Sequence, residues 1–138
     1  MQTIIQHVDG SLVGPVAAAI AVVGFVALIV FQCLLASGAP LGHLAWGGAH
    51  RRLPPGLRVA SALAAGFLVF GVVCILERAG AVHVIGDAAV VRWTVWSLVA
   101  LFALSLVANL ASRSAAERRM GVPLTLVLTA ACAVVAAS

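Results

Sequence analysis

The chain has 138 residues and a formal net charge of +4; 64% of it is hydrophobic and only 9% is charged. Soluble domains have about 45–50% apolar and about 25% charged residues, so this composition excludes an ordinary water-soluble globule and indicates a membrane protein. The basic residues are all arginines that flank apolar runs, which favours contact with a membrane surface over nucleic-acid binding. The length allows one domain, residues 1–138.

Four apolar runs come close to the length of about 20 residues that a membrane-spanning helix needs. They predict an all-α membrane protein, a bundle of four transmembrane helices at residues 13–35, 59–76, 93–111 and 122–137. Asp9 or Ser11 is expected to cap the first helix, with Pro15 in its first turn. The fourth helix is expected to be short, because its run rises only about 24 Å.

The first run can also be interpreted as a cleaved signal peptide, because small residues at 36–39 mimic a cleavage site. Signal peptides begin with basic residues and have a short apolar core. Residues 1–12 contain no lysine or arginine, and the run is longer than a signal core. We therefore expect a retained helix. Its face of small residues is expected to pack closely on a neighbouring helix, at Ala17, Ala18, Ala21 and Gly24.

Most of the positive charge lies in two of the three loops. Six of the eight arginines occupy the first and third loops, at Arg51, Arg52, Arg58, Arg113, Arg118 and Arg119. The positive-inside rule predicts that both loops face the cytoplasm and that both termini lie outside it, in a multi-pass protein of a bacterial plasma membrane. On the opposite side, Glu77 with Arg78 and Asp87 with Arg92 are expected to form exposed ion pairs.

Polar groups within the spans are few. No charged residue lies at the centre of a run, which argues against a proton- or cation-coupled carrier. Gln32, Ser61, Asn109 and Thr125 all map to the ends nearest the arginine-rich loops. They are expected either to join helices by hydrogen bonds or to form the floor of a pocket. Residues 112–119 predict a polar hairpin, in which Ser114 and Glu117 have the spacing of a capping box.

The first loop, residues 38–58, is the best place for a site, since it holds five of the thirteen glycines and two of the four histidines. Gly47-Gly48 permits unusual backbone angles, and Pro54-Pro55 stiffens the approach to the second helix. We expect the loop to fold back against the bilayer surface, with Trp46 in the headgroup zone.

Three interpretations of this loop remain open. Its arginines bind anionic lipid non-specifically, or they hold one defined anionic ligand together with glycine N–H groups. The third interpretation is catalysis by His43 or His50, which lack a carboxylate in the loop and a nucleophile beside them. No catalytic residue, metal or cofactor is predicted. The candidate ligand-binding residues are Gln32, His43, Trp46, His50, Arg51, Arg52, Arg58, Asn109 and Arg113.

The loop also carries a recognisable pattern. It runs Gly38-Ala39-Pro40-x-Gly42, then Trp46-Gly47-Gly48, then Leu53-Pro54-x-x-Leu57-Arg58, and it is followed later by Ala108-Asn109-Leu110-Ala111-Ser112-Arg113-Ser114, Glu117-Arg118 and Pro123. This pattern resembles an uncharacterised family of small four-helix integral membrane proteins of actinobacteria and some other bacteria. The resemblance covers most of residues 38–123. It implies the fold, and it implies that the first loop and residues 109–113 form one feature, but it implies no activity.

These observations predict a non-enzymatic accessory subunit or lipid-associated protein of a membrane complex. Its partners would be anionic lipid headgroups, another membrane protein or a second copy of the chain. The alternative is an oligomeric transporter or membrane enzyme for a small or lipid-like substrate, with a site that faces the cytoplasm. A shaped polar cavity beneath the first loop would favour this alternative.

Overall fold

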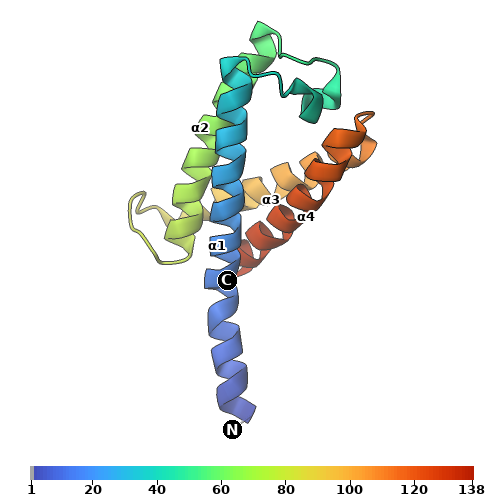
Figure 1. Cartoon of the computed structure of the whole chain (residues 1–138). Helices are drawn as coiled ribbons and strands as arrows, with labels where there is room; N and C mark the ends of the chain where they lie inside the picture. The colour runs from blue at the N-terminus through green and yellow to red at the C-terminus, as the bar shows by residue number, and fades with distance from the viewer. Residues whose placement is uncertain (1) are drawn as a thin grey trace.

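The chain is almost entirely helical. The computed structural model describes the backbone of residues 2–138 and the side chains from Leu12 onward. The elements, in order, are α1 Gln2–Ser37, η1 Gly42–Leu44, η2 Trp46–Gly48, α2 Pro55–Arg78, α3 Ala88–Ala111 and α4 Ala115–Ala137 (Figure 1). The four α-helices are long and apolar enough to cross a membrane, with Leu12–Ser37 as the candidate span in α1. The predicted all-α fold with four transmembrane helices is confirmed.

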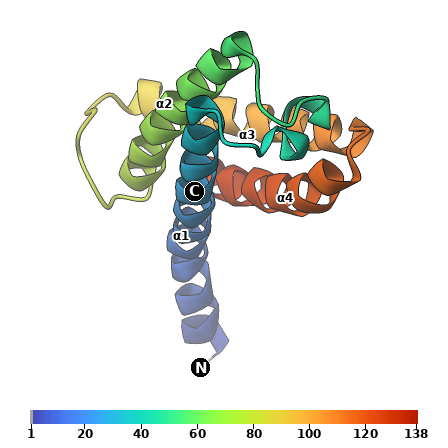
Figure 2. The same ribbon diagram turned by 45° about the horizontal axis from the view of Figure 1, so that its top comes forward.

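The helices form two hairpins, α1–α2 and α3–α4, which cross at an angle (Figures 1 and 2). The C-terminal half of α4 packs on α1, while the N-terminal end of α4, at the α3–α4 turn, lies farther from α1. The segment between α1 and α2 extends from the top of α1 toward that turn. Both arginine-rich loops therefore lie at the same end of the bundle.

Small residues allow the helices to cross closely. Ala17, Ala18 and Ala21 are buried, as the small-residue face of the first run predicts. A Cβ on Gly24 would lie 2.5 Å from Cδ2 of the buried Leu128 side chain, so Leu128 of α4 packs directly against this glycine of α1. In lipid, such close van der Waals packing replaces the hydrophobic drive that water supplies to soluble bundles.

The bundle presents large apolar side chains on its outside. The side chains of Val23, Leu63 and Leu104 are 71%, 71% and 70% exposed. Most other long aliphatic residues on the outer faces are also exposed. This surface would be a large aggregation liability in water, whereas it matches the hydrocarbon of a bilayer.

Every helix extends beyond its apolar run. Helix α4 begins at Ala115, so it has 23 residues instead of the expected short span of residues 122–137, and the predicted hairpin at 112–119 shrinks to residues 112–114. Helix α1 already begins at Gln2, so Pro15 lies inside it and not in its first turn. The predicted caps Asp9 and Ser11 are also within the helix; their side chains lie outside the described residues.

The prediction of ion pairs at the end opposite the arginine-rich loops is wrong. The Glu77 carboxylate accepts hydrogen bonds from the backbone N–H groups of Val84, Ile85 and Gly86, at 3.1, 2.8 and 2.8 Å. Asp87 caps α3 and accepts from two further backbone N–H groups, at 2.8 and 3.1 Å. Backbone N–H groups at a helix start or in a tight loop need acceptors, and here the two carboxylates satisfy them.

Candidate functional site

The first loop is a closed, folded structure. The Gly42 N–H donates to the carbonyl of Arg51 at 3.1 Å, which joins the two arms of the loop. A Cβ on Gly42 would lie 2.3 Å from the carbonyl oxygen of His50, so only glycine allows this approach. Trp46, Gly47 and Gly48 all have positive φ angles, at 54°, 80° and 70°. The loop therefore folds back on itself, as the glycine content predicts.

The loop is docked on the start of α4. Ser114 Oγ donates to the His43 carbonyl at 2.8 Å, and the Gly47 N–H donates to Glu117 Oε1 at 3.3 Å. Gly48 packs directly over Ser114, where an added Cβ would lie 2.5 Å from the serine Cβ. These contacts join residues about 70 positions apart in sequence, and they tie the first hairpin to the second.

Trp46 connects the same loop to α2. Its indole Nε1 donates to Ser61 Oγ at 3.3 Å. Ser61 is fully buried, whereas 45% of the Trp46 side chain is exposed. The polar edge of the ring therefore anchors the loop, while part of its apolar face is left for the surroundings. This arrangement agrees with the behaviour of tryptophan at a membrane interface.

Glu117 is the polar centre of this end of the molecule. It is only 8% exposed, and its carboxylate accepts from the Gly47 N–H and from Ser112 Oγ. The capping box forms in part, since Ser114 Oγ accepts from the Glu117 N–H at 3.2 Å. The Glu117 carboxylate does not return to the Ser114 N–H, which donates to Ser112 Oγ at 3.1 Å instead. Glu117 therefore holds the first loop against the start of α4.

The arginines of this end fall into two groups. Arg58 Nε donates to the Ala36 carbonyl at 2.8 Å, and Arg118 Nη1 donates to the Ser112 carbonyl at 2.6 Å. Both guanidinium groups thus satisfy carbonyls near helix C-termini, where a positive charge is favourable. The other four are exposed, and within the described residues their guanidinium groups make no hydrogen bond: Arg51, Arg52, Arg113 and Arg119.

The remaining predicted residues do not converge on one pocket. Asn109 Nδ2 donates to Thr125 Oγ1 at 3.4 Å, with Gly121 against its amide, so it joins α3 to α4. Gln32 is half-buried, and its Oε1 is buried without a partner in the described structure. The His43 and His50 side chains are exposed. The structure brings together the loop and the α3–α4 turn, but it keeps Asn109 between helices.

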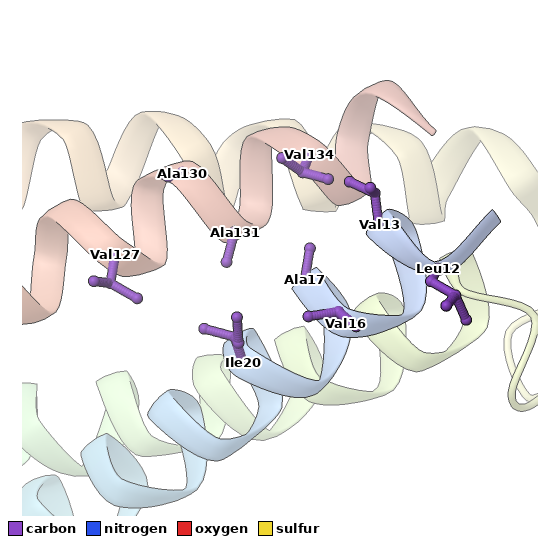
Figure 3. Close-up of a pocket in the computed structure, with 9 residues that line it drawn as sticks. All are labelled: Leu12, Val13, Val16, Ala17, Ile20, Val127, Ala130, Ala131 and Val134. Carbon is purple, nitrogen blue, oxygen red and sulfur yellow. The ribbon is translucent and has the colours of Figure 1, made fainter. Parts of the chain in front are cut away.

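Two hollows of the structure lie elsewhere. One is an apolar groove of about 450 Å³ between α1 and α4, in which Ile20 and Val127 face each other (Figure 3). The other, of about 430 Å³, lies at the opposite end of the bundle and is lined by Arg78, Ala88, Ala89 and Arg92. Neither contains a predicted site residue.

Sequence reasoning missed Glu117 as a site residue and treated it as part of a local cap. One signal could have found it: it is the one carboxylate among six arginines in the two loops. An acid so placed is expected to have a partner, although the sequence could not show that the partner is a backbone N–H of the distant loop.

Comparison with known proteins identifies no relative. No family model, no curated protein and no solved structure matches the chain. The resemblance based on the loop pattern stays a prediction. Function must therefore be inferred from the chemistry of the two ends of the bundle.

Proposed function

We propose that this small integral membrane protein binds anionic lipid headgroups through its arginine-rich end, as a lipid-associated protein or an accessory subunit of a complex in the bacterial plasma membrane. One observation carries the proposal. Glu117, the one carboxylate at this end among the described side chains, is turned inward onto Gly47 and Ser112. It therefore does not neutralise the four exposed arginines, which are left for external anions.

The docked loop supports this proposal because it gives the charges a fixed platform. Hydrogen bonds to Ser114, Glu117 and Ser61 hold the loop on two helices. A preorganised surface loses less conformational entropy on binding than a flexible arm. Each arginine near an anionic leaflet contributes roughly 1 kcal/mol of attraction, so four together can retain a lipid shell.

The proposal includes an orientation, with the arginine-rich end in the cytoplasm and both termini outside. It can be tested with Arg51→Cys, Arg118→Cys and Val84→Cys, each made in a Cys33→Ala background and treated with a membrane-impermeant maleimide. In intact cells only Val84→Cys should react, and in inverted vesicles only the other two should react. Labelling of positions 51 and 118 from opposite faces would overturn the topology.

Lipid binding is tested with the protein in mild detergent. Native mass spectrometry would count retained phosphatidylglycerol in the wild type and in a variant with Arg51, Arg52, Arg113 and Arg119 replaced by glutamine. We expect fewer anionic lipids in the variant and unchanged retention of phosphatidylcholine, because only anions gain from guanidinium contacts. Equal retention of phosphatidylglycerol would contradict the proposal. Co-purified proteins in the same spectra would identify a complex.

The alternative, an oligomeric transporter or membrane enzyme, is supported by one feature only. The buried Oε1 of Gln32 has no hydrogen-bond donor in the described structure, and such a group usually has a partner. A substrate or a second copy could supply that donor. The two hollows described above, however, are not lined by Gln32 or by the first loop, so we favour lipid association.

A further inference from the structure

A second basic feature lies at the end opposite to the arginine-rich loops. A hollow of about 430 Å³ is lined by Arg78, the last residue of α2, and by Ala88, Ala89 and Arg92 from the first turns of α3. The two guanidinium groups therefore come from different helices and share one cavity. The alanines between them add no bulk, so the cavity stays open.

Neither arginine is neutralised by the acids nearby. Glu77 is occupied by three backbone N–H groups of the loop, and Asp87 by two N–H groups of α3. Arg78 is half-buried, and it makes only a long contact of 3.4 Å from Nη2 to the Ala136 carbonyl. Its Nε is buried and has no hydrogen-bond partner in the described structure. A buried donor of this kind needs an acceptor, and an anion in the hollow would provide one.

The hollow lies at the ends of two candidate membrane spans, since one ends at Arg78 and the next begins at Ala88. Trp93 and Trp96 follow Arg92 on α3 and are 66% and 45% exposed. Arg92 lies 5.6 Å from the centre of the Trp93 ring, in a cation–π arrangement. Exposed tryptophans near a helix end are typical of the interface between hydrocarbon and water. These features match a position near the phosphate groups of a bilayer.

We propose that Arg78 and Arg92 form a binding site for one phosphate-bearing anion at this end of the bundle. Phosphate oxygens match guanidinium donors in geometry and charge, and two arginines can contact one phosphate from both sides. The source of the phosphate is either a phospholipid headgroup or a soluble phosphate. The site is separate from the arginine-rich end and does not depend on its function.

A reporter within the hollow tests the proposal without interference from the other end. Ala88→Cys, in a Cys33→Ala background, would be labelled with a neutral maleimide in mild detergent. Dihexanoyl phosphatidylglycerol at ten times its dissociation constant should slow labelling about tenfold, because only the empty site reacts. Dihexanoyl phosphatidylcholine has the same chains and no net charge. Its phosphate should protect much less, since the quaternary ammonium of its choline repels the arginines.

Two arms distinguish the source of the anion. Inorganic phosphate that protects as well as the lipid at equal concentration would assign a soluble ligand, while protection by the lipid alone would assign a headgroup. Arg78→Gln with Arg92→Gln should abolish protection. The matched control, Arg51→Gln with Arg119→Gln, removes the same charge at the other end and should leave protection intact.

A second variant keeps the test decisive if the double arginine variant fails to fold. Ala89→Asp places a carboxylate in the first turn of α3, where it is compatible with the helix, and it should compete for the arginines and abolish protection. Ala89→Asn has the same shape without the charge and should retain protection. No protection in the parent protein, or protection that survives Ala89→Asp, would overturn the proposal.

Discussion

The two ends of the bundle use a glutamate in the same way but over different distances in the chain. At one end Glu77 accepts from the N–H groups of Val84, Ile85 and Gly86, only seven to nine residues away. At the other end Glu117 accepts from the Gly47 N–H, 70 residues away. The first contact shapes one loop, whereas the second fastens one hairpin to the other. At both ends the glutamate carboxylate accepts from backbone N–H groups and from no arginine within the described residues.

Removing the two acids should show this difference most strongly. Glu117→Ala leaves the Gly47 N–H and Ser112 Oγ without their charged acceptor, and hydrogen bonds to charged groups contribute about 1.5–3 kcal/mol each. We expect the loop to detach and the free energy of unfolding to fall by about 3 kcal/mol. Hydrogen exchange should accelerate at residues 42–51 and at the start of α4, both hairpins being affected.

The matched comparison is Glu77→Ala. It should accelerate exchange at residues 84–86 and leave the first loop protected, because its partners are local. Glu117→Gln keeps a carbonyl acceptor for Gly47 and should retain much of the lost stability. Unchanged exchange at residues 42–51 in Glu117→Ala would show that the distant tie does not hold the hairpins together.

The sequence predicted the helices better than their ends. Apolar runs identify the four spans because the hydrocarbon thickness sets their length. Hydropathy treats Arg118 and Arg119 as loop residues, yet α4 begins at Ala115, because the Ser114 cap decides where the backbone becomes helical. The sequence likewise could not show that Pro15 lies within α1, since helices in membranes tolerate proline when neighbours satisfy the backbone.

The sequence predicted that the first loop is folded, but it did not predict which groups hold the loop in place. Glycine content and a lone tryptophan indicate a folded loop from local sequence alone. The roles of Arg58 and Glu117 depend on which carbonyl or N–H group the crossing of the hairpins brings near. Arg58 was predicted only as a ligand-binding residue, and in the structure its Nε also donates to the Ala36 carbonyl at the end of α1. Contacts of this kind follow from the angle between hairpins, which no local pattern encodes.

Substitutions of the adjacent Gly47 and Gly48 test whether the first loop rests on Ser114. Gly48→Ala would place a Cβ 2.5 Å from Ser114 Cβ at a φ of +70°, so it incurs both a clash and backbone strain. We expect a loss of about 2–3 kcal/mol. Gly47→Ala has a similar φ of +80° with nothing within 4 Å, so it should lose only about 1 kcal/mol. Thermal unfolding in detergent measures both, and equal losses would mean that the loop does not rest on Ser114.

Arg58 and Arg51 of the first loop are expected to differ in their effect on stability. Arg58→Gln loses the hydrogen bond from Nε to the Ala36 carbonyl, which should reduce the free energy of unfolding by about 1 kcal/mol. Arg51→Gln removes an exposed guanidinium and should change stability by no more than about 0.5 kcal/mol, while it weakens retention of anionic lipid. Paired measurements of melting temperature and bound phosphatidylglycerol check both effects. A strong stability loss in Arg51→Gln would show that this side chain has an internal partner.

The smallest expected effect concerns the link between the loop and α2. Trp46→Phe removes the indole N–H that donates to Ser61 at 3.3 Å but keeps most of the aromatic surface. A neutral hydrogen bond of this length contributes about 0.5–1 kcal/mol, and Ser61 can return its hydroxyl to a backbone carbonyl of its own helix. Ser61→Ala is the reciprocal change, and the double variant should be no less stable than the weaker single variant, because both remove the same bond. Additive losses would show that the two side chains act separately, and the first loop would then depend on Ser114 and Glu117 alone.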